Sequence, residues 1–217
     1  MRFIKFLEKA FSKDSFDIKK RVEYDFNALK YNSNNNFAVL SVDLQDSNLS
    51  QFENKKITYL LEYHKELQKI CKKNSIPFIL TVYGQEEEHK LKNEFNLRYI
   101  KETPSSTEMT QVNQFLQREN IKSVYVIGIV RSICIFATLN SLNKLGYQTY
   151  TSIIGTAMNK KLYSSLNTAP VTRTSNDSKK IQIIKNLYSE FEIEKFSLKK
   201  ELILLKQIGT KILDYKD

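Results

Sequence analysis

The chain has 217 residues, which is enough for one substantial hydrophobic core, and length alone favours one domain over two. Hydrophobic residues make up 41% of it and charged residues 27%, as in an ordinary soluble globular protein. No apolar stretch approaches the ~20 residues needed to span a bilayer. We therefore expect no integral membrane segment.

The first residues lack the continuous apolar region and cleavage site of a secretory signal. Two cysteines without an obvious pairing suit a reducing compartment, so we expect a cytoplasmic protein. The formal net charge of +10 could indicate an anionic partner. However, the lysines are scattered among acids and form no basic block interleaved with aromatic residues, so we expect no nucleic-acid partner.

Residues 1–36 form a predicted N-terminal helical extension ahead of one domain at 37–217. Apolar residues between positions 3 and 11 recur at helical spacing, which predicts a short amphipathic helix. Such a helix could lie on a membrane, but packing against the domain or a second subunit is favoured. We accordingly expect a homo-oligomer. The polar tract 32–36 reads as a loop.

From residue 37 the chain alternates between apolar runs of strand length and amphipathic helical stretches. Such alternation, with nearly continuous apolar strands, predicts a parallel sheet covered on both faces. A surface insertion is expected at about 158–178. The predicted strands are 37–42, 77–83, 97–100, 123–129, 147–154 and 192–196, and the predicted helices are 57–71, 109–116, 132–146, 179–190 and 198–213.

Three chemically useful side chains each follow an apolar run. Asp43 follows the first run, Lys101 follows 97–100, and Cys134 comes a short turn after 123–129. Ligand sites of open α/β folds lie at the carboxyl edge of the sheet, where these residues would gather. An acid, an amine and a thiol there indicate nucleophilic catalysis by cysteine.

Cys134 has two readings. With Ser132 as N-cap of a helix that Gly146 ends, the thiol would lie in the first helical turn, where the helix dipole lowers a thiol pKa. Alternatively, it is a buried structural cysteine, because its neighbours are apolar. For Cys71, in the middle of an apolar helix face, the structural reading is preferred.

The other candidate residues are also ambiguous when taken singly. Asp43 could exchange a proton with a thiol or leaving group, or it could cap the next element. Lys101 could stabilise a nearby thiolate and carboxylate, or it could simply be solvated. His64 and His89 share no metal-ligand spacing, so we expect no metal site.

Three segments together resemble the isochorismatase-like cysteine hydrolases, a superfamily that includes nicotinamidases, N-carbamoylsarcosine amidase and isochorismatase. Residues 39–45 (VLSVDLQ) resemble a first strand that ends in an Asp-x-Gln motif. Lys101, with Ser105 and Ser106 after it, is similar to the segment around the family lysine. Residues 128–138 (GIVRSICIFAT) resemble the nucleophile segment. The likeness spans about residues 37–157.

The resemblance implies a three-layer α/β/α, Rossmann-like fold with a six-stranded parallel sheet in the order 3-2-1-4-5-6. It implies a triad of Asp43, Lys101 and Cys134 that cleaves a small amide or related C–N bond through a covalent thioester, without a cofactor. A non-proline cis peptide before the nucleophile, here Val130–Arg131, would help to shape the oxyanion hole. Backbone N–H groups near Arg131 and Cys134 would receive the oxyanion.

Several positions depart from the family pattern. Thr107 stands where an aromatic residue is common, Gly155-Thr156 replaces an Asp, and Arg131 occupies a position that is often small or acidic. The metal set of nicotinamidases is also missing. These changes argue against a nicotinamidase and leave open a weak or inactive member that acts as a binding module. A nucleotide-binding module is disfavoured, because the five glycines form no phosphate loop.

Overall fold

The structure is a computed structural model that describes residues 17–50, 52–83, 89–91, 97–101, 110–129, 131–157 and 198–213. Its centre is a seven-stranded sheet with parallel pairings in the order β3-β2-β1-β4-β5-β7, and β6 pairs with β4 off this path. The predicted α/β fold and strand order are confirmed, with β7 in the sixth position. The strands are β1 (Phe37–Val42), β2 (Phe78–Tyr83), β3 (Arg98–Lys101), β4 (Ser123–Ile129), β5 (Gln148–Thr151), β6 (Thr156–Ala157) and β7 (Lys211–Ile212).

The two central strands, β1 and β4, are buried along their whole length. Both consist mainly of apolar residues without polar alternation, because each is covered on both faces. Their register pairs Val42 at the end of β1 with Gly128 near the end of β4. The residues that follow the two strands therefore emerge side by side.

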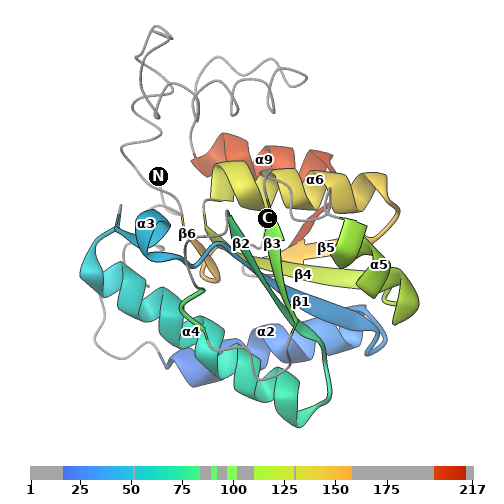
Figure 1. Cartoon of the computed structure of the whole chain (residues 1–217), viewed down its shortest axis with the longest axis horizontal. Coiled ribbons are helices and arrows are strands. Elements are labelled where there is room, and N and C mark those ends of the chain that lie inside the picture. Colours follow the sequence, from blue (N-terminus) through green and yellow to red (C-terminus); the bar gives the residue numbers. More distant parts are fainter. Residues whose placement is uncertain are drawn as a thin grey trace, which may run out of the picture.

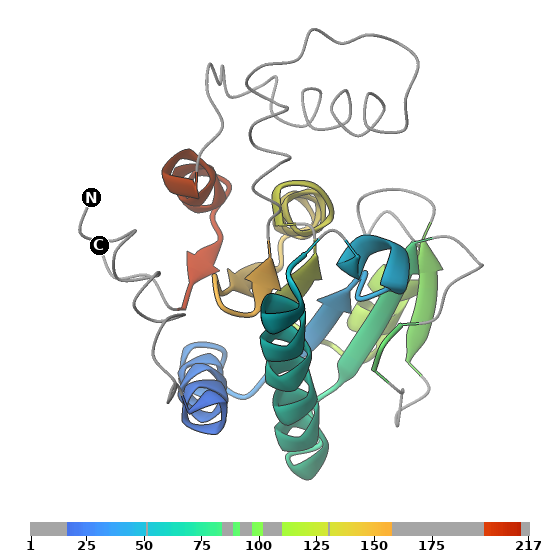
Figure 2. The same cartoon turned by 90° about the vertical axis from the view of Figure 1, so that its left-hand side faces the viewer.

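Helices cover both faces of this sheet. In Figures 1 and 2, α2 (Ile18–Asn32) and α4 (Asn54–Lys73) lie side by side on one face, whereas α6 (Phe136–Lys144) and α9 (Leu198–Gln207) lie on the other. Two shorter helices are α3 (Asp46–Leu49) and α5 (Thr110–Arg118). Among the helices of the described ranges, none has the length and apolarity that crossing a membrane would require.

The described part of the predicted N-terminal extension is helix α2, which packs onto the domain. Asp17 caps it by accepting a hydrogen bond from the backbone N–H of Lys20. Its buried face joins the main hydrophobic core through Val22, Phe26 and Leu29. Residues 33–36 form the predicted loop, with positive φ at Asn34 and Asn35. The helix predicted near residues 3–11 lies outside the described residues.

Helix α4 confirms most of the predicted apolar face. Its buried residues are Leu60, Tyr63, His64, Leu67 and Cys71, while Ile57 and Leu61 are partly buried. Tyr63 donates a hydrogen bond to the buried carboxylate of Asp25, which ties α4 to α2. The buried polar groups on this face therefore have specific partners, as burial requires.

Two glycines set the ends of the helices on the opposite face. Gly146 has φ +86 and ends α6 as predicted, with its N–H bonded to the Asn143 carbonyl and the next N–H to that of Leu142. Gly209, at φ +85, ends α9 in the same way. The prediction of one helix over 198–213 is therefore wrong beyond Gln207, because the chain turns and enters β7. The elements predicted within 158–197 lie outside the described residues.

Candidate active site

The three predicted catalytic residues come from strands that end at the same edge of the sheet. Asp43 follows β1, and the turn that carries Cys134 follows the neighbouring strand β4. Lys101 ends β3, which is two strand spacings from β1, or about 10 Å. In the register of the sheet, Val42 at the end of β1 pairs with Thr81, and Lys101 pairs with Tyr83, two residues further along β2. The Lys101 side chain lies outside the description, so contact within the triad remains a prediction.

Asp43 occupies a tight turn directly after β1. It is fully buried and adopts φ +58, a left-handed conformation that Asp tolerates better than most residues. Its N–H donates to the carbonyl of Thr81 (2.9 Å), and its own carbonyl accepts the N–H of Gln45 (2.8 Å). The side-chain amide of Asn48 also donates to that carbonyl (3.4 Å). The backbone of this turn is thus fixed from both flanks.

Cys134 lies in a single π-helical turn, η1 (Arg131–Ile135), that continues directly into α6. Cys134 is partly buried and packs against the hydrophobic core. The prediction of Ser132 as N-cap is wrong, because the backbone is already helical at Arg131 and Ser132 lies inside the turn. The thiol still belongs to the first turn of the helical stretch. Single π-helical turns often mark functional sites.

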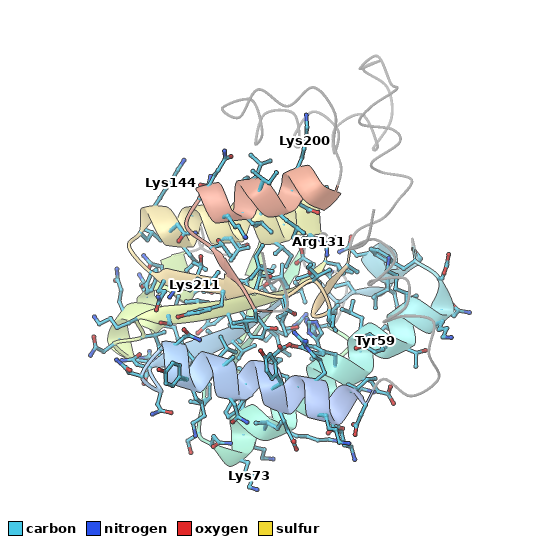
Figure 3. The ribbon with its side chains drawn as sticks, turned by 180° about the vertical axis from the view of Figure 1, so that it is seen from behind. Tyr59, Lys73, Arg131, Lys144, Lys200 and Lys211 are labelled. Carbon is cyan, nitrogen blue, oxygen red and sulfur yellow. The ribbon has the colours of Figure 1, made fainter. Side chains whose placement is uncertain are left out.

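Arg131 was predicted to contribute backbone groups to the oxyanion hole. Its side chain is buried and forms an ion pair with Glu201 of α9, with 3.0 Å between Nε and Oε2. The guanidinium also donates to the carbonyl of Ile153 (3.4 Å) and to Oγ1 of Thr156 (3.3 Å). Figure 3 shows Arg131 next to α9. The side chain thus braces the turn that carries Cys134, whereas the Val130–Arg131 peptide stays a prediction because Val130 is not described.

Sequence reasoning missed a buried polar cluster of Ser41, His64 and His89. Oγ of Ser41 lies 2.9 Å from Nδ1 of His64 and 3.2 Å from Nε2 of His89. All three residues are buried. A signal was present: a serine inside an otherwise apolar strand and a histidine on an apolar helix face both need partners in the core.

Burial keeps both histidines neutral. It lowers the pKa of His64 to about 4, although a hydrogen bond to the Gly155 carbonyl acts in the opposite direction. Burial also lowers the pKa of His89 to about 3, with a further contribution from His64. Across the ranges that the structure describes, no group of three or more His, Cys, Asp or Glu residues could hold a metal ion.

Comparisons with known proteins agree with this architecture. Residues 37–152, more than half of the chain, match the family model described as the Isochorismatase domain. This range includes all three strands that lead to Asp43, Lys101 and Cys134. A search of curated protein sequences found no match.

Several solved structures share the fold at low identity. The nicotinamidase of Staphylococcus aureus is 14% identical, with a TM-score of 0.53 over 82% of this chain and 98% of that one. The pyrazinamidase of Pyrococcus horikoshii, in complex with zinc, is 15% identical, with a TM-score of 0.55 over 83% and 99%. The YcaC gene product of Escherichia coli, an octameric hydrolase of unknown specificity, is 14% identical, with a TM-score of 0.53 over 82% and 74%.

Proposed function

Because the chain belongs to the isochorismatase domain family, we propose that it is a cysteine hydrolase acting on a small amide or related C–N bond. The observation that carries the proposal is the placement of Asp43 and the Cys134 turn after adjoining strands at one edge of the sheet. A partly buried thiol in the first turn of a helical stretch is suited to nucleophilic attack. Lys101, at the end of β3, is the proposed third member.

In the proposed first half-reaction, the carboxylate of Asp43 takes the proton of the Cys134 thiol. The sulfur attacks the carbonyl carbon of the substrate and forms a C–S bond, while the carbonyl π electrons move to the oxygen. Lys101 favours the thiolate through its positive charge. When the tetrahedral intermediate collapses, the C–N bond breaks and Asp43 returns its proton to the leaving nitrogen. The products are an amine and a thioester on Cys134.

In the second half-reaction, Asp43 takes a proton from water as that water attacks the thioester carbon. Collapse breaks the C–S bond, releases the carboxylic acid and returns the proton to sulfur, which restores the starting enzyme. Backbone N–H groups near Arg131 and Cys134 would stabilise the oxyanion in both steps. The brace between Arg131 and Glu201 supports this role, because it fixes the start of the turn that carries Cys134.

We further propose that the reaction needs no cofactor or metal, although one related structure was solved with zinc. His64 and His89, the histidines that could have supplied ligands, are hydrogen-bonded to Ser41 in the core. A cytoplasmic homo-oligomer acting on a small molecule completes the proposal, and the octameric relative supports the assembly. Loss of activity on chelation, restored by zinc, would contradict the metal-free mechanism.

A panel of small amides, assayed with the full chain and with Cys134→Ala, tests the function. The expected result is release of ammonia or amine from at least one panel member by the wild-type protein and none by the variant. Mass spectrometry of a quenched reaction should show the acyl group on Cys134. If no amide is cleaved and Cys134 is unreactive toward iodoacetamide, the chain is instead a binding module on a hydrolase fold.

A further inference from the structure

We propose that Ser41, His64 and His89 form a positioning chain, a line of buried hydrogen bonds that fixes the Asp43 turn relative to the Cys134 turn. This inference rests on the proposed function of those two turns. This line of hydrogen bonds starts at His89 in segment 89–91 and passes through Ser41 in β1. It then reaches His64 in α4 and the carbonyl of Gly155 before β6. None of its three side chains belongs to the proposed triad.

The partners at the two ends fix the direction of every hydrogen bond. Nε2 of His64 lies 2.9 Å from the carbonyl oxygen of Gly155, which can only accept, so Nε2 carries the proton. The neutral ring then accepts at Nδ1, and the Ser41 hydroxyl must donate to it. At the other end, the N–H of Leu91 donates to Nδ1 of His89 (3.1 Å), so Nε2 of His89 donates to Ser41.

One end of the chain holds the segment beside Asp43. His89 is followed by Lys90, whose N–H donates to the carbonyl of Leu44 (2.8 Å), the residue after Asp43. The Lys90 ammonium also pairs with the carboxylate of Asp46, the first residue of α3. Segment 89–91 is therefore attached to the Asp43 turn on its far side and to β1 through Ser41.

The other end holds the segment beneath the Cys134 turn. The Gly155 carbonyl that accepts from His64 also accepts the N–H of Gly128 in β4 (2.9 Å). Directly after Gly155, strand β6 pairs with Gly128 and Ile129, the last residues of β4. The Arg131 side chain donates hydrogen bonds to the same segment, at the Ile153 carbonyl and at Oγ1 of Thr156. The segment thus contacts the end of β4 and the first residue of the turn that carries Cys134.

The chain has the properties of a positioning device rather than of a second nucleophile. Ser41 has no exposed surface, and its proton is committed to His64. Burial lowers the pKa of both histidines and keeps them neutral, so this line of hydrogen bonds carries no net charge. Each of these three side chains donates one hydrogen bond and accepts one. Removing any of them therefore leaves a buried polar group without its hydrogen bond and loosens the segments that the bond joins.

The test is the pH profile of Cys134 alkylation by iodoacetamide, followed by mass spectrometry on the intact chain. Ser41→Ala removes both central bonds. His64→Asn keeps an acceptor near Nδ1 but loses the donor to Gly155, whereas His64→Gln keeps that donor but loses the acceptor for Ser41. Thr149→Val is the matched control, because it also removes a buried hydroxyl in the sheet, at 2.9 Å from Thr210 in an unconnected cluster.

We expect each chain variant to move the apparent thiol pKa toward the ~8.5 of free cysteine, by about half a unit, or about threefold in thiolate population. Thr149→Val should leave the profile unchanged. In one outcome, the wild-type protein shows a Cys134 pKa below that of free cysteine while the Ser41 and His64 variants show the same value. That result would overturn the positioning inference and leave the proposed function standing. If the wild-type thiol itself titrates like free cysteine, the proposed function fails first.

A measurement on the unmodified protein covers the case in which a variant does not fold. Nitrogen NMR of the two histidine rings reports which ring nitrogen carries the proton. The positioning chain requires the Nε2–H form in both His64 and His89 at neutral pH. The Nδ1–H form of either ring would reverse a link and overturn the inference.

Discussion

The carbonyl oxygen of Val42 occupies the space that a side chain on Gly128 would need: a Cβ there would lie 2.1 Å from that oxygen. Gly128 also has φ +123, which L side chains rarely adopt. The close approach joins β1 to β4 one residue before Asp43. Glycine at this position is therefore a requirement of the site's backbone as well as of the sheet.

Gly128→Ala should destabilise the fold by more than the ~1–3 kcal/mol of a strained backbone alone, because the strands must also separate. The free energy of unfolding in urea measures this loss. Gly146→Ala is the matched control: its φ is also positive, but nothing lies within 4 Å of an added Cβ. Equal losses in the two variants would contradict the packing argument.

Asp43→Asn should lower kcat by about 10²–10⁴, the usual contribution of general acid–base catalysis, once a cleaved amide is known. An amide side chain nearly preserves the size of Asp43 but cannot take the thiol proton. Glu119→Gln, which changes an exposed carboxylate just after α5, is the control and should retain activity. Wild-type turnover by Asp43→Asn would remove Asp43 from the mechanism.

Iodoacetamide should alkylate Cys134 near neutral pH and spare Cys71. Cys71 is fully buried on α4, and burial raises its pKa far above the ordinary value, so its thiolate is scarce. Lys101→Ala should raise the Cys134 pKa and slow its alkylation, because a nearby cation favours the thiolate. Peptide mapping after limited labelling measures both effects. An unchanged rate in Lys101→Ala would exclude Lys101 from the site.

Stability should fall as the solution is acidified below pH 6.5. The folded-state pKa values of His64 and His89 lie below their ordinary 6.5, at about 4 and about 3. Below pH 6.5 the two histidines therefore bind more protons in the unfolded chain than in the folded protein. The free energy of unfolding that the neutral histidines contribute is complete above pH 6.5. It declines toward pH 4 by about 1.4 kcal/mol per pH unit for each histidine. Urea unfolding measures this slope, and His64→Gln should remove about half of it.

Glu201→Gln should destabilise the protein by about 3–5 kcal/mol, because it removes the carboxylate charge that pairs with the buried Arg131 guanidinium. The double variant Arg131→Met, Glu201→Leu should recover most of this loss. Lys69→Ala, which removes an exposed ion pair with Glu66, should cost under about 1 kcal/mol. Thermal unfolding of the Glu201→Gln, double and Lys69→Ala variants measures these losses. If Glu201→Gln cost no more stability than Lys69→Ala, the Arg131–Glu201 ion pair would not stabilise the fold as argued.

The sequence predicted the central sheet well because its strands carry their own signal. The sequence predicts strand β4 with its observed ends, because a short apolar run rich in β-branched residues favours a buried strand over a helix. The C-terminal edge was predicted poorly. Lys211 and Ile212 form a strand of two residues, too short for any periodicity, and only pairing with β5 defines it.

The candidate site divides in the same way. Asp43 and Cys134 could be placed by counting from strand ends, because parallel strands set their ends at one edge. The pairing of Arg131 with Glu201 could not be predicted, because Glu201 lies 70 residues further along the sequence, on α9. Likewise, Ser41 and His89 are 48 residues apart, and no local pattern relates them.

The late position of Glu201 in the chain has a consequence for biosynthesis. Because a ribosome releases the chain from its N-terminus, Arg131 and Cys134 emerge well before the glutamate that pairs with the guanidinium. Nascent chains that contain the Cys134 turn but end before Glu201 therefore lack the ion pair that joins Arg131 to α9. We expect such chains to keep that turn open to solvent and proteases until α9 docks, so the Cys134 turn would be among the last parts of the molecule to mature.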